Sequence, residues 1–249
     1  MRCPQCDHEQ SLADTCIRCG IVFSKYHEIQ KRKTKASQKP DRVGEPLLEL
    51  SLPLEKEGFL ASLFQASLHP WEIVSTPALI AISSGFGVVV YFLATVDLRD
   101  MGSSLVLFMV HNVNLVFHEA GHWIFGVLRN ETLTILGGSL NQVLIPSIVA
   151  VAFWRNRDPA GFAFGVFWMF ENFVDVAVYM ADARALELPL IGGQGEEAHD
   201  WRNLFMHWGL LSKDTVIAGY VRNIGWLGMV SAWVWLIWRW FANREETRA

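Results

Sequence analysis

The residues best suited to do chemistry in this chain are the two histidines and the glutamate of the run His118-Glu119-Ala120-Gly121-His122. Residues four apart on an α-helix lie about 40° apart around its axis, so both imidazoles can reach one metal ion. A zinc ion held in this way activates water, and the adjacent Glu119 can remove the proton. The flanking residues are strongly apolar, which indicates a transmembrane helix, where ionisable side chains usually have a function.

A catalytic zinc ion usually takes three protein ligands and water, so a third ligand is expected from elsewhere in the chain. Asp175 is the preferred candidate, because it shares with Glu171 one face of the apolar segment 159–181, and that face must point into a bundle. Glu171 and His199 are the alternatives. Asp200 is interpreted as a residue that orients an imidazole.

Further polar residues are expected near this site without binding the metal. His111 precedes His118 by seven residues on the same helical face, and Asn172 flanks the acidic face of residues 159–181. The run 137–142 (GGSLNQ) can offer free backbone groups that hold a peptide as an added strand, or it can be a simple helix break. Its candidate substrate contacts are Gly138, Asn141 and Gln142.

All four cysteines lie near the N-terminus, in two Cys-x2-Cys pairs: Cys3, Cys6, Cys16 and Cys19. Four thiolates at this spacing are typical of a structural zinc site, with bound iron or redox-active thiols as alternatives. The sequences CPQC and CIRCG resemble the two knuckles of a rubredoxin-like zinc ribbon. Because four protein ligands leave no open position, this unit is expected to stabilise the chain or to recruit a cytosolic partner.

The chain has 249 residues, of which 51% are hydrophobic, and its net charge of −4 does not suggest nucleic acid as a partner. Charge and apolar character are unevenly distributed, which predicts several regions. They are a zinc ribbon (1–26), a charged linker (27–57), an interfacial helix (58–70), a transmembrane metallopeptidase-like domain (71–241) and a polar tail (242–249).

The expected fold is an all-α polytopic membrane protein of four to five transmembrane helices. The apolar segments cover residues 74–96, 101–128, 132–154, 159–181 and 216–238. Gly137, Gly138 and Pro146 interrupt the third segment, which is therefore predicted to be broken or re-entrant. A re-entrant segment is preferred because it would place the downstream arginines on the cytoplasmic side, together with the basic N-terminal region. No cleavable signal peptide is visible.

The HEAGH run resembles the site-2-protease class of intramembrane zinc metalloproteases, over roughly residues 103–182. In that family an HExxH helix gives two zinc ligands and the catalytic glutamate, and an aspartate of a later transmembrane helix completes the site. The resemblance implies that His118 and His122 are ligands, that Glu119 is the base and that Asp175 is the third ligand. It also suggests a protein of the bacterial inner membrane.

The sequence thus predicts a zinc metallopeptidase with one catalytic and one structural zinc ion, acting on membrane-anchored or bilayer-associated peptides. One alternative is a non-proteolytic membrane protein in which the metal organises the bundle and the ribbon recruits a partner. A minor alternative is a di-iron oxidase or desaturase, because two histidines four apart also fit one of its histidine boxes. Such sites need many histidines, and this chain has eight.

Overall fold

A computed structural model describes residues 1–25 and 69–246, except for residues 5, 12–13, 20 and 191–197. The chain divides into two compact units, Met1–Lys56 and Glu57–Ala249. The predicted linker (27–57) lies outside the described residues, as does all of the predicted interfacial helix (58–70) except its last two residues.

The N-terminal unit is a small fold built around the cysteines. Two isolated antiparallel bridges, Arg2 with Glu9 and Thr15 with Val22, each close one turn of the chain. Among its described residues the buried apolar ones are Cys3, Cys16 and Phe23. A core of this size contributes little stability, so a cross-link such as a metal ion would stabilise this region.

The described part of the second unit is helical. Its helices are α3 (Thr76–Thr95), α4 (Leu105–Gly126), α5 (Glu131–Arg155), α6 (Pro159–Ala181), α7 (Asp200–His207) and α8 (Asp214–Glu246). A side chain suited to capping precedes each of the first five and accepts a hydrogen bond from a backbone N–H of the first turn. These caps are Ser75, Ser104, Asn130, Asp158 and His199.

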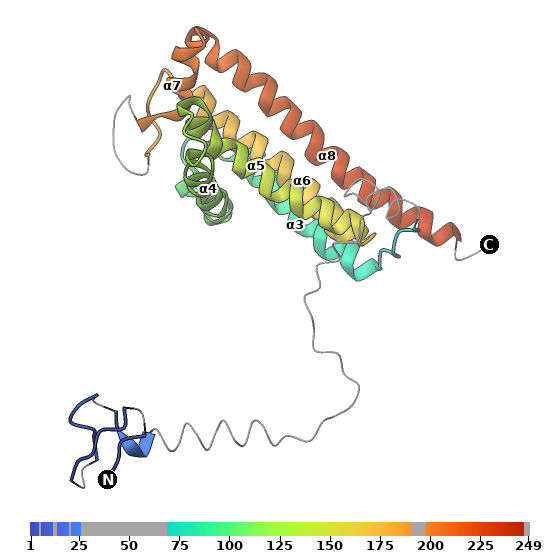
Figure 1. The fold of residues 1–249 in the computed structure, drawn as a ribbon. Helices are drawn as coiled ribbons and strands as arrows, with labels where there is room; N and C mark the ends of the chain where they lie inside the picture. Colours follow the sequence, from blue (N-terminus) through green and yellow to red (C-terminus); the bar gives the residue numbers. More distant parts are fainter. Residues whose placement is uncertain (5, 12–13, 20, 26–68, 191–197, 247–249) are drawn as a thin grey trace. The chain divides into compact units, whose positions relative to one another are not determined.

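The long helices α3, α5, α6 and α8 lie roughly along one direction, and α4 crosses them near one end (Figure 1). Helix α6 packs against α5 and α8, and α5 packs against α4. The main apolar core lies between α3, α6 and α8, where the rings of Phe86 and Phe167 stack with centroids 3.9 Å apart. In a second apolar cluster, α7 packs against α6 and α8 through Trp201, Leu204 and Phe205.

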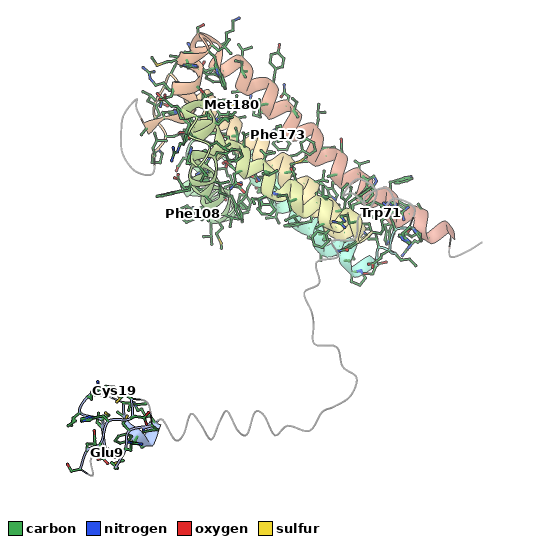
Figure 2. All side chains as sticks on the ribbon, viewed as in Figure 1. Glu9, Cys19, Trp71, Phe108, Phe173 and Met180 are labelled. Atoms are coloured by element: carbon green, nitrogen blue, oxygen red, sulfur yellow. The ribbon has the colours of Figure 1, made fainter. Side chains whose placement is uncertain are left out.

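Three described helices, α3, α5 and α6, are long and apolar enough to cross a membrane, which suggests a membrane protein. Helices α4 and α8 are not among them, so the predicted four to five crossings remain a prediction. The outer side of α4 is nevertheless apolar: Phe108 points away from the bundle (Figure 2), and Trp123 is 83% exposed. A helix face of this kind is suited to contact with lipid.

The prediction of a broken or re-entrant third segment is wrong, because α5 is one continuous helix of 25 residues with Pro146 inside it. Its glycines serve packing instead. A Cβ at Gly121 of α4 would clash with the carbonyl oxygen of Gly137, so the two helices approach closely only because both residues lack side chains. The helical backbone also removes the free groups that strand addition would need.

Candidate metal centre

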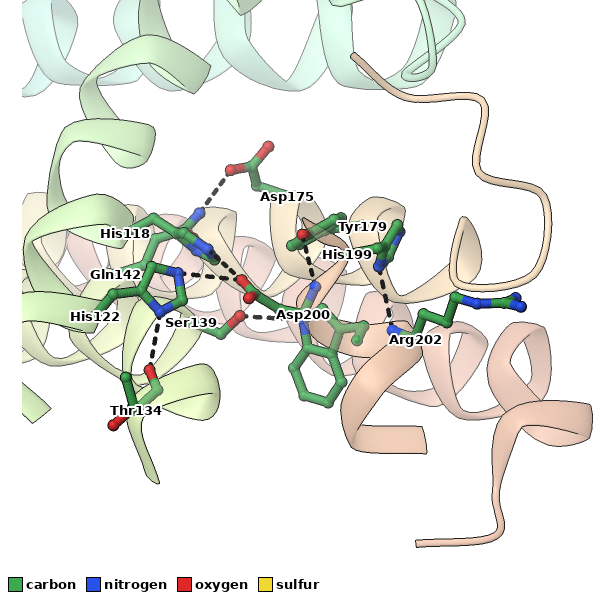
Figure 3. Close-up of polar contacts among 11 residues, drawn as sticks. His118, His122, Thr134, Ser139, Gln142, Asp175, Tyr179, His199, Asp200 and Arg202 are labelled. Atoms are coloured by element: carbon green, nitrogen blue, oxygen red, sulfur yellow. Dashed lines mark hydrogen bonds and ion pairs between the residues drawn. The ribbon is translucent and has the colours of Figure 1, made fainter. Parts of the chain in front are cut away.

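Two imidazoles and one carboxylate converge at the end of the bundle where α4, α5 and α7 meet (Figure 3). The Nε2 atom of His118 lies 2.9 Å from Oδ2 of Asp200, and the Nε2 atom of His122 lies 3.1 Å from the same oxygen. The three ligand atoms lie within 4.8 Å of one another. His118 is buried, and His122 and Asp200 are half-buried.

Helix α5 fixes both rings from their other nitrogen atoms. The Nδ1 atom of His118 lies 3.1 Å from Oε1 of Gln142, and the Nδ1 atom of His122 lies 2.8 Å from the carbonyl oxygen of Thr134. Both partners are acceptors, so each Nδ1 carries the proton and donates it. In a neutral ring the Nε2 atom then presents a lone pair, which is the state that binds a metal.

A proton or a metal ion can therefore lie between these groups. Two Nε2 lone pairs and a carboxylate oxygen are all acceptors, and acceptors at these distances repel one another unless a proton or a metal ion lies between them. Zinc bonds of about 2.0–2.1 Å in a tetrahedral site place the ligand atoms about 3.3 Å apart. The observed separations of 2.9 and 3.1 Å fit such a site after a small outward adjustment.

Gly138 keeps the space beside the two rings open. A Cβ at this position would lie 2.6 Å from Nε2 of both His118 and His122. Gly138 is in the second turn of α5, directly opposite the histidines of α4, so only a residue without a side chain fits there. Because Gly138 has no side chain, the space in which an ion can contact both rings stays open.

Asp200 is the first residue of α7, and four contacts set its position. Its backbone N–H donates to the Tyr179 hydroxyl (3.0 Å), and Nε1 of the next residue, Trp201, donates to Ser139 Oγ (3.1 Å). Burial alone would raise the pKa of the Asp200 carboxyl, but the adjoining His118 and His122 rings, which donate from Nε2 when they are protonated, outweigh it and lower the pKa. Asp200 thus carries the negative charge that a metal ion needs.

The sequence prefers Asp175 as third ligand, but the carboxylate that the described structure brings to His118 and His122 is that of Asp200. Asp175 instead accepts a hydrogen bond from Gln142 Nε2 (2.6 Å) and lies 2.8 Å from His111 Nδ1. Asp175 therefore orients the Gln142 amide so that its oxygen faces His118. Asp175 thus contacts residues beside the two histidines of this group and not those histidines themselves.

The two alternative ligands also lie elsewhere. Glu171 is buried and accepts a hydrogen bond from Asn114 Nδ2 (2.9 Å). His199 is fully buried and caps α7, with Nδ1 accepting from the Arg202 N–H (3.2 Å) and Nε2 lying 3.3 Å from Asp182. His199 thus fixes the start of the helix that presents Asp200.

Of the remaining predicted site residues, Glu119 is half-buried on α4, next in sequence to His118. Asn141 donates to the Phe117 carbonyl oxygen (2.7 Å) and so ties α5 to α4. Asn172 donates to the Trp168 carbonyl oxygen within its own helix. In the described part of the chain both amides thus donate to backbone carbonyl oxygens and not to the histidines.

The four cysteines also form a group able to hold a metal ion. Cys3 Sγ lies 3.7 Å from Cys19 Sγ, and Cys6 Sγ lies 3.7 Å from Cys16 Sγ. Zinc–sulfur bonds of about 2.3 Å in a tetrahedron require sulfur atoms about 3.8 Å apart. A disulfide would instead bring two sulfurs to about 2.05 Å. The spacing therefore fits a four-thiolate metal site.

Comparison of the chain with protein-family models, with curated proteins and with solved structures finds no match. The interpretation of both sites therefore rests on residue chemistry and geometry. For Asp200 one sequence signal existed: an acid follows a histidine at the start of a short segment with apolar residues at helical spacing. That signal was outweighed by the expectation that the third ligand lies on a membrane-spanning helix.

Proposed function

We propose that this protein is a membrane-embedded zinc metallopeptidase whose catalytic ion is held by His118, His122 and Asp200. The observation that carries the proposal is the convergence of two Nε2 lone pairs on one carboxylate, with both Nδ1 atoms already occupied. Three protein ligands leave one coordination position open, as in catalytic sites, whereas structural zinc sites use four.

A zinc ion bound here would supply Lewis-acid activation of water and of the scissile carbonyl group. Glu119, adjacent in sequence to a ligand and half-buried, accepts a proton from the attacking water as its oxygen bonds to the carbonyl carbon. When the carbon–nitrogen bond breaks, Glu119 returns this proton to the leaving amine. The carboxylate is regenerated, so the cycle consumes only water.

The position of the site within the bundle supports substrates close to the bilayer surface. Thr134 and Gly138 belong to the first two turns of α5, and Tyr179 is two residues before the end of α6. With a rise of about 1.5 Å per residue, the centre lies about 5–10 Å inside the ends of these helices. We propose membrane-anchored peptides or proteins as substrates, in a bacterial inner membrane with the ribbon in the cytoplasm.

The alternative of a non-proteolytic scaffold requires a metal site closed by its own ligands. The three-residue group and the partial exposure of His122 and Asp200 favour a catalytic site instead. The ribbon can still recruit a cytosolic partner in either case. The di-iron alternative needs several carboxylates and histidines around two ions, and the described residues hold no such larger group.

The proposal is tested by comparing Glu119→Gln with Asp200→Asn in the full-length protein purified in detergent. Zinc content is measured by mass spectrometry of the metal, and proteolysis with labelled casein and a pool of quenched fluorescent peptides. We expect Glu119→Gln to keep the zinc and lose activity by about 10²–10⁴-fold. Asp200→Asn should lose the zinc of the membrane unit, because a neutral amide is a poor ligand.

Glu131→Gln is the matched control, since Glu131 is an exposed acid at the start of α5. It should change neither zinc content nor activity. Full proteolysis by the Glu119→Gln variant would refute the proposed base. Undiminished zinc in Asp200→Asn would refute the ligand set.

A further inference from the structure

We infer that Tyr179 is a catalytic residue, whose hydroxyl donates a hydrogen bond to the oxyanion that forms when water adds to the scissile carbonyl. This inference rests on the proposed peptidase function. Tyr179 was not among the candidate site residues of the sequence. Only the tertiary structure brings Tyr179 next to the candidate metal centre, where α4, α6 and α7 meet (Figure 3).

Tyr179 lies against the metal-binding residues. Its ring centroid is 5.8 Å from that of His118 and 4.4 Å from that of His199. Its hydroxyl is 3.0 Å from the backbone nitrogen of Asp200, the residue whose carboxylate meets both histidines. The hydroxyl is therefore fixed next to Asp200, a proposed ligand of the ion, on the side of the site formed by α6 and α7.

The hydrogen bonding of Tyr179 leaves its proton available. The phenol oxygen accepts the Asp200 N–H, which fixes the oxygen in place and uses one of its lone pairs. Within the part of the chain that the structure describes, its O–H has no acceptor. A phenol with a pKa near 10 is protonated at neutral pH, so Tyr179 can donate.

The proposed reaction needs such a donor. Water addition places negative charge on the carbonyl oxygen, and fixed donors aimed at that oxygen usually contribute a large part of the rate. A carboxylate, such as that of Glu119 or Asp200, only accepts hydrogen bonds and cannot donate to this oxygen. The amides of Asn141 and Gln142, which the sequence predicted as substrate contacts, donate instead to Phe117 and Asp175.

Glu119 is next in sequence to His118, whose ring centroid lies 5.8 Å from that of Tyr179. The phenol only donates a hydrogen bond: no bond to Tyr179 is made or broken. Glu119 moves the proton, while Tyr179 stabilises the charge. This division of roles predicts that losing the phenol oxygen weakens transition-state binding more than substrate binding.

The test compares Tyr179→Phe with the wild-type protein in three measurements. They are steady-state hydrolysis of a quenched fluorescent peptide, calorimetric binding of a phosphinic peptide that mimics the tetrahedral oxyanion, and zinc affinity by competition with a chelator. We expect kcat to fall about 10²-fold, as for loss of one oxyanion donor, with KM nearly unchanged. Phosphinic-peptide affinity should fall by a similar factor, and zinc affinity should be unchanged.

Tyr220→Phe is the matched control, because Tyr220 is 67% exposed on α8. Wild-type kcat and phosphinic-peptide affinity in Tyr179→Phe would overturn the inference while leaving the peptidase proposal intact. Loss of zinc by this variant would also overturn it, because Tyr179 would then be a positioning residue for Asp200. Full activity of Glu119→Gln, in contrast, would defeat the proposed function itself.

Discussion

The side-chain amide of Gln142 determines which nitrogen of His118 presents its lone pair to the candidate metal centre. Gln142 donates from Nε2 to Asp175, so its Oε1 faces Nδ1 of His118 and fixes the proton on that nitrogen. If the amide were reversed, its oxygen would face the carboxylate of Asp175, and two acceptors would repel each other. Asp175 therefore influences the candidate metal centre through Gln142 and His118, without being a ligand itself.

At the same scale, Gly138→Ala should reduce zinc binding by the membrane unit. The added Cβ would lie 2.6 Å from Nε2 of both histidines, far inside normal contact distance, so the rings must move away from Asp200. We expect zinc affinity, measured by competition with a chelator, to fall at least about 10-fold, equivalent to about 1.4 kcal/mol. Helix content, measured by circular dichroism, should not fall, because alanine favours helices.

Gly85→Ala is the corresponding control in α3, where an added Cβ meets nothing within 4 Å. It should leave zinc affinity unchanged. Equal zinc affinities of the Gly138→Ala variant and the wild type would mean that the ion does not lie between the two rings.

At the scale of elements, short polar contacts hold the segment that carries Asp200. Helix α6 ends at Ala181, and the next residue, Asp182, is its C-cap. The Asp182 carboxylate accepts hydrogen bonds from the backbone N–H groups of Glu187 and Leu188 and lies 3.3 Å from His199. His199 then caps α7. The connection between α6 and α7 is therefore anchored at both ends, which places Asp200 without requiring it to be part of a long helix.

A second anchor joins the end of α6 to the start of α8. The Arg184 guanidinium contacts the fully buried Asp214 carboxylate at 2.6–2.9 Å, and Asp214 begins α8. Burial alone would raise the pKa of Asp214, but the hydrogen bonds from Arg184 and the Thr215 N–H outweigh it, so the pKa is lowered. The ionised carboxylate is thus the form that stabilises the fold.

We therefore expect Asp214→Asn to lower the free energy of unfolding by about 1–2 kcal/mol at pH 7, as for loss of hydrogen bonds to a charged group. A carboxyl with a lowered folded-state pKa stabilises the protein above its unfolded value of about 3.9. This contribution disappears as the pH falls below that value, through the lower folded-state pKa. Denaturant unfolding in detergent at pH 7 and below pH 4 should show the difference between variant and wild type shrinking.

Asp97→Asn is the control for this prediction, because Asp97 is exposed and its carboxylate accepts a hydrogen bond from the nearby Arg99 N–H. Its effect should be below about 0.5 kcal/mol at either pH. A constant difference between Asp214→Asn and the wild type across this pH range would contradict the assigned role of the charge.

At the scale of the whole molecule, the two units hold two groups of different chemistry that could each bind a metal ion. The four cysteines form a closed set of thiolates, whereas the membrane unit offers two imidazoles and one carboxylate. Since four thiolates leave no coordination position and the second set leaves one, the first suits structure and the second suits catalysis. The two sites belong to separate compact units of the chain, so each should bind its metal independently.

Replacing Cys16 by serine should therefore lower the zinc content from two ions per chain to one. Cys16 is buried in the N-terminal unit and lies 3.7 Å from Cys6, so the variant loses one of four ligands and much of a small core. Metal analysis of the full-length protein gives the stoichiometry, and peptide hydrolysis reports on the membrane unit. Hydrolysis should continue at the wild-type rate.

Ser51→Ala, outside the cysteine-bearing residues, provides a substitution in the same unit that should keep both ions. If Cys16→Ser abolished both zinc ions, the two sites would be coupled, and the ribbon would be required for assembly of the catalytic unit.

Patterns among residues close together in the sequence predict several of the helices and both groups of metal-binding residue types. The spacing of His118 and His122, the cysteine pairs and the long apolar segments all depend on residues close together in sequence, where helix geometry fixes which side chains share a face. The segment 159–181 coincides with α6, and Asn130 and Asp158 mark helix starts as capping residues do. The unbroken α5 was not predictable from composition, because Gly137 and Gly138 also suit a break.

The sequence by itself determined that this chain is helical, that it has long apolar segments, and that it carries two sets of metal-binding residue types. Only the tertiary structure decided that Asp200 rather than Asp175 meets the histidines, and that Tyr179 lies beside them. The physical reason is that α7 takes its place through burial of Trp201, Leu204 and Phe205 against distant helices. Helical periodicity relates neighbours in sequence, but it contains no information about how a short helix packs at the end of a bundle.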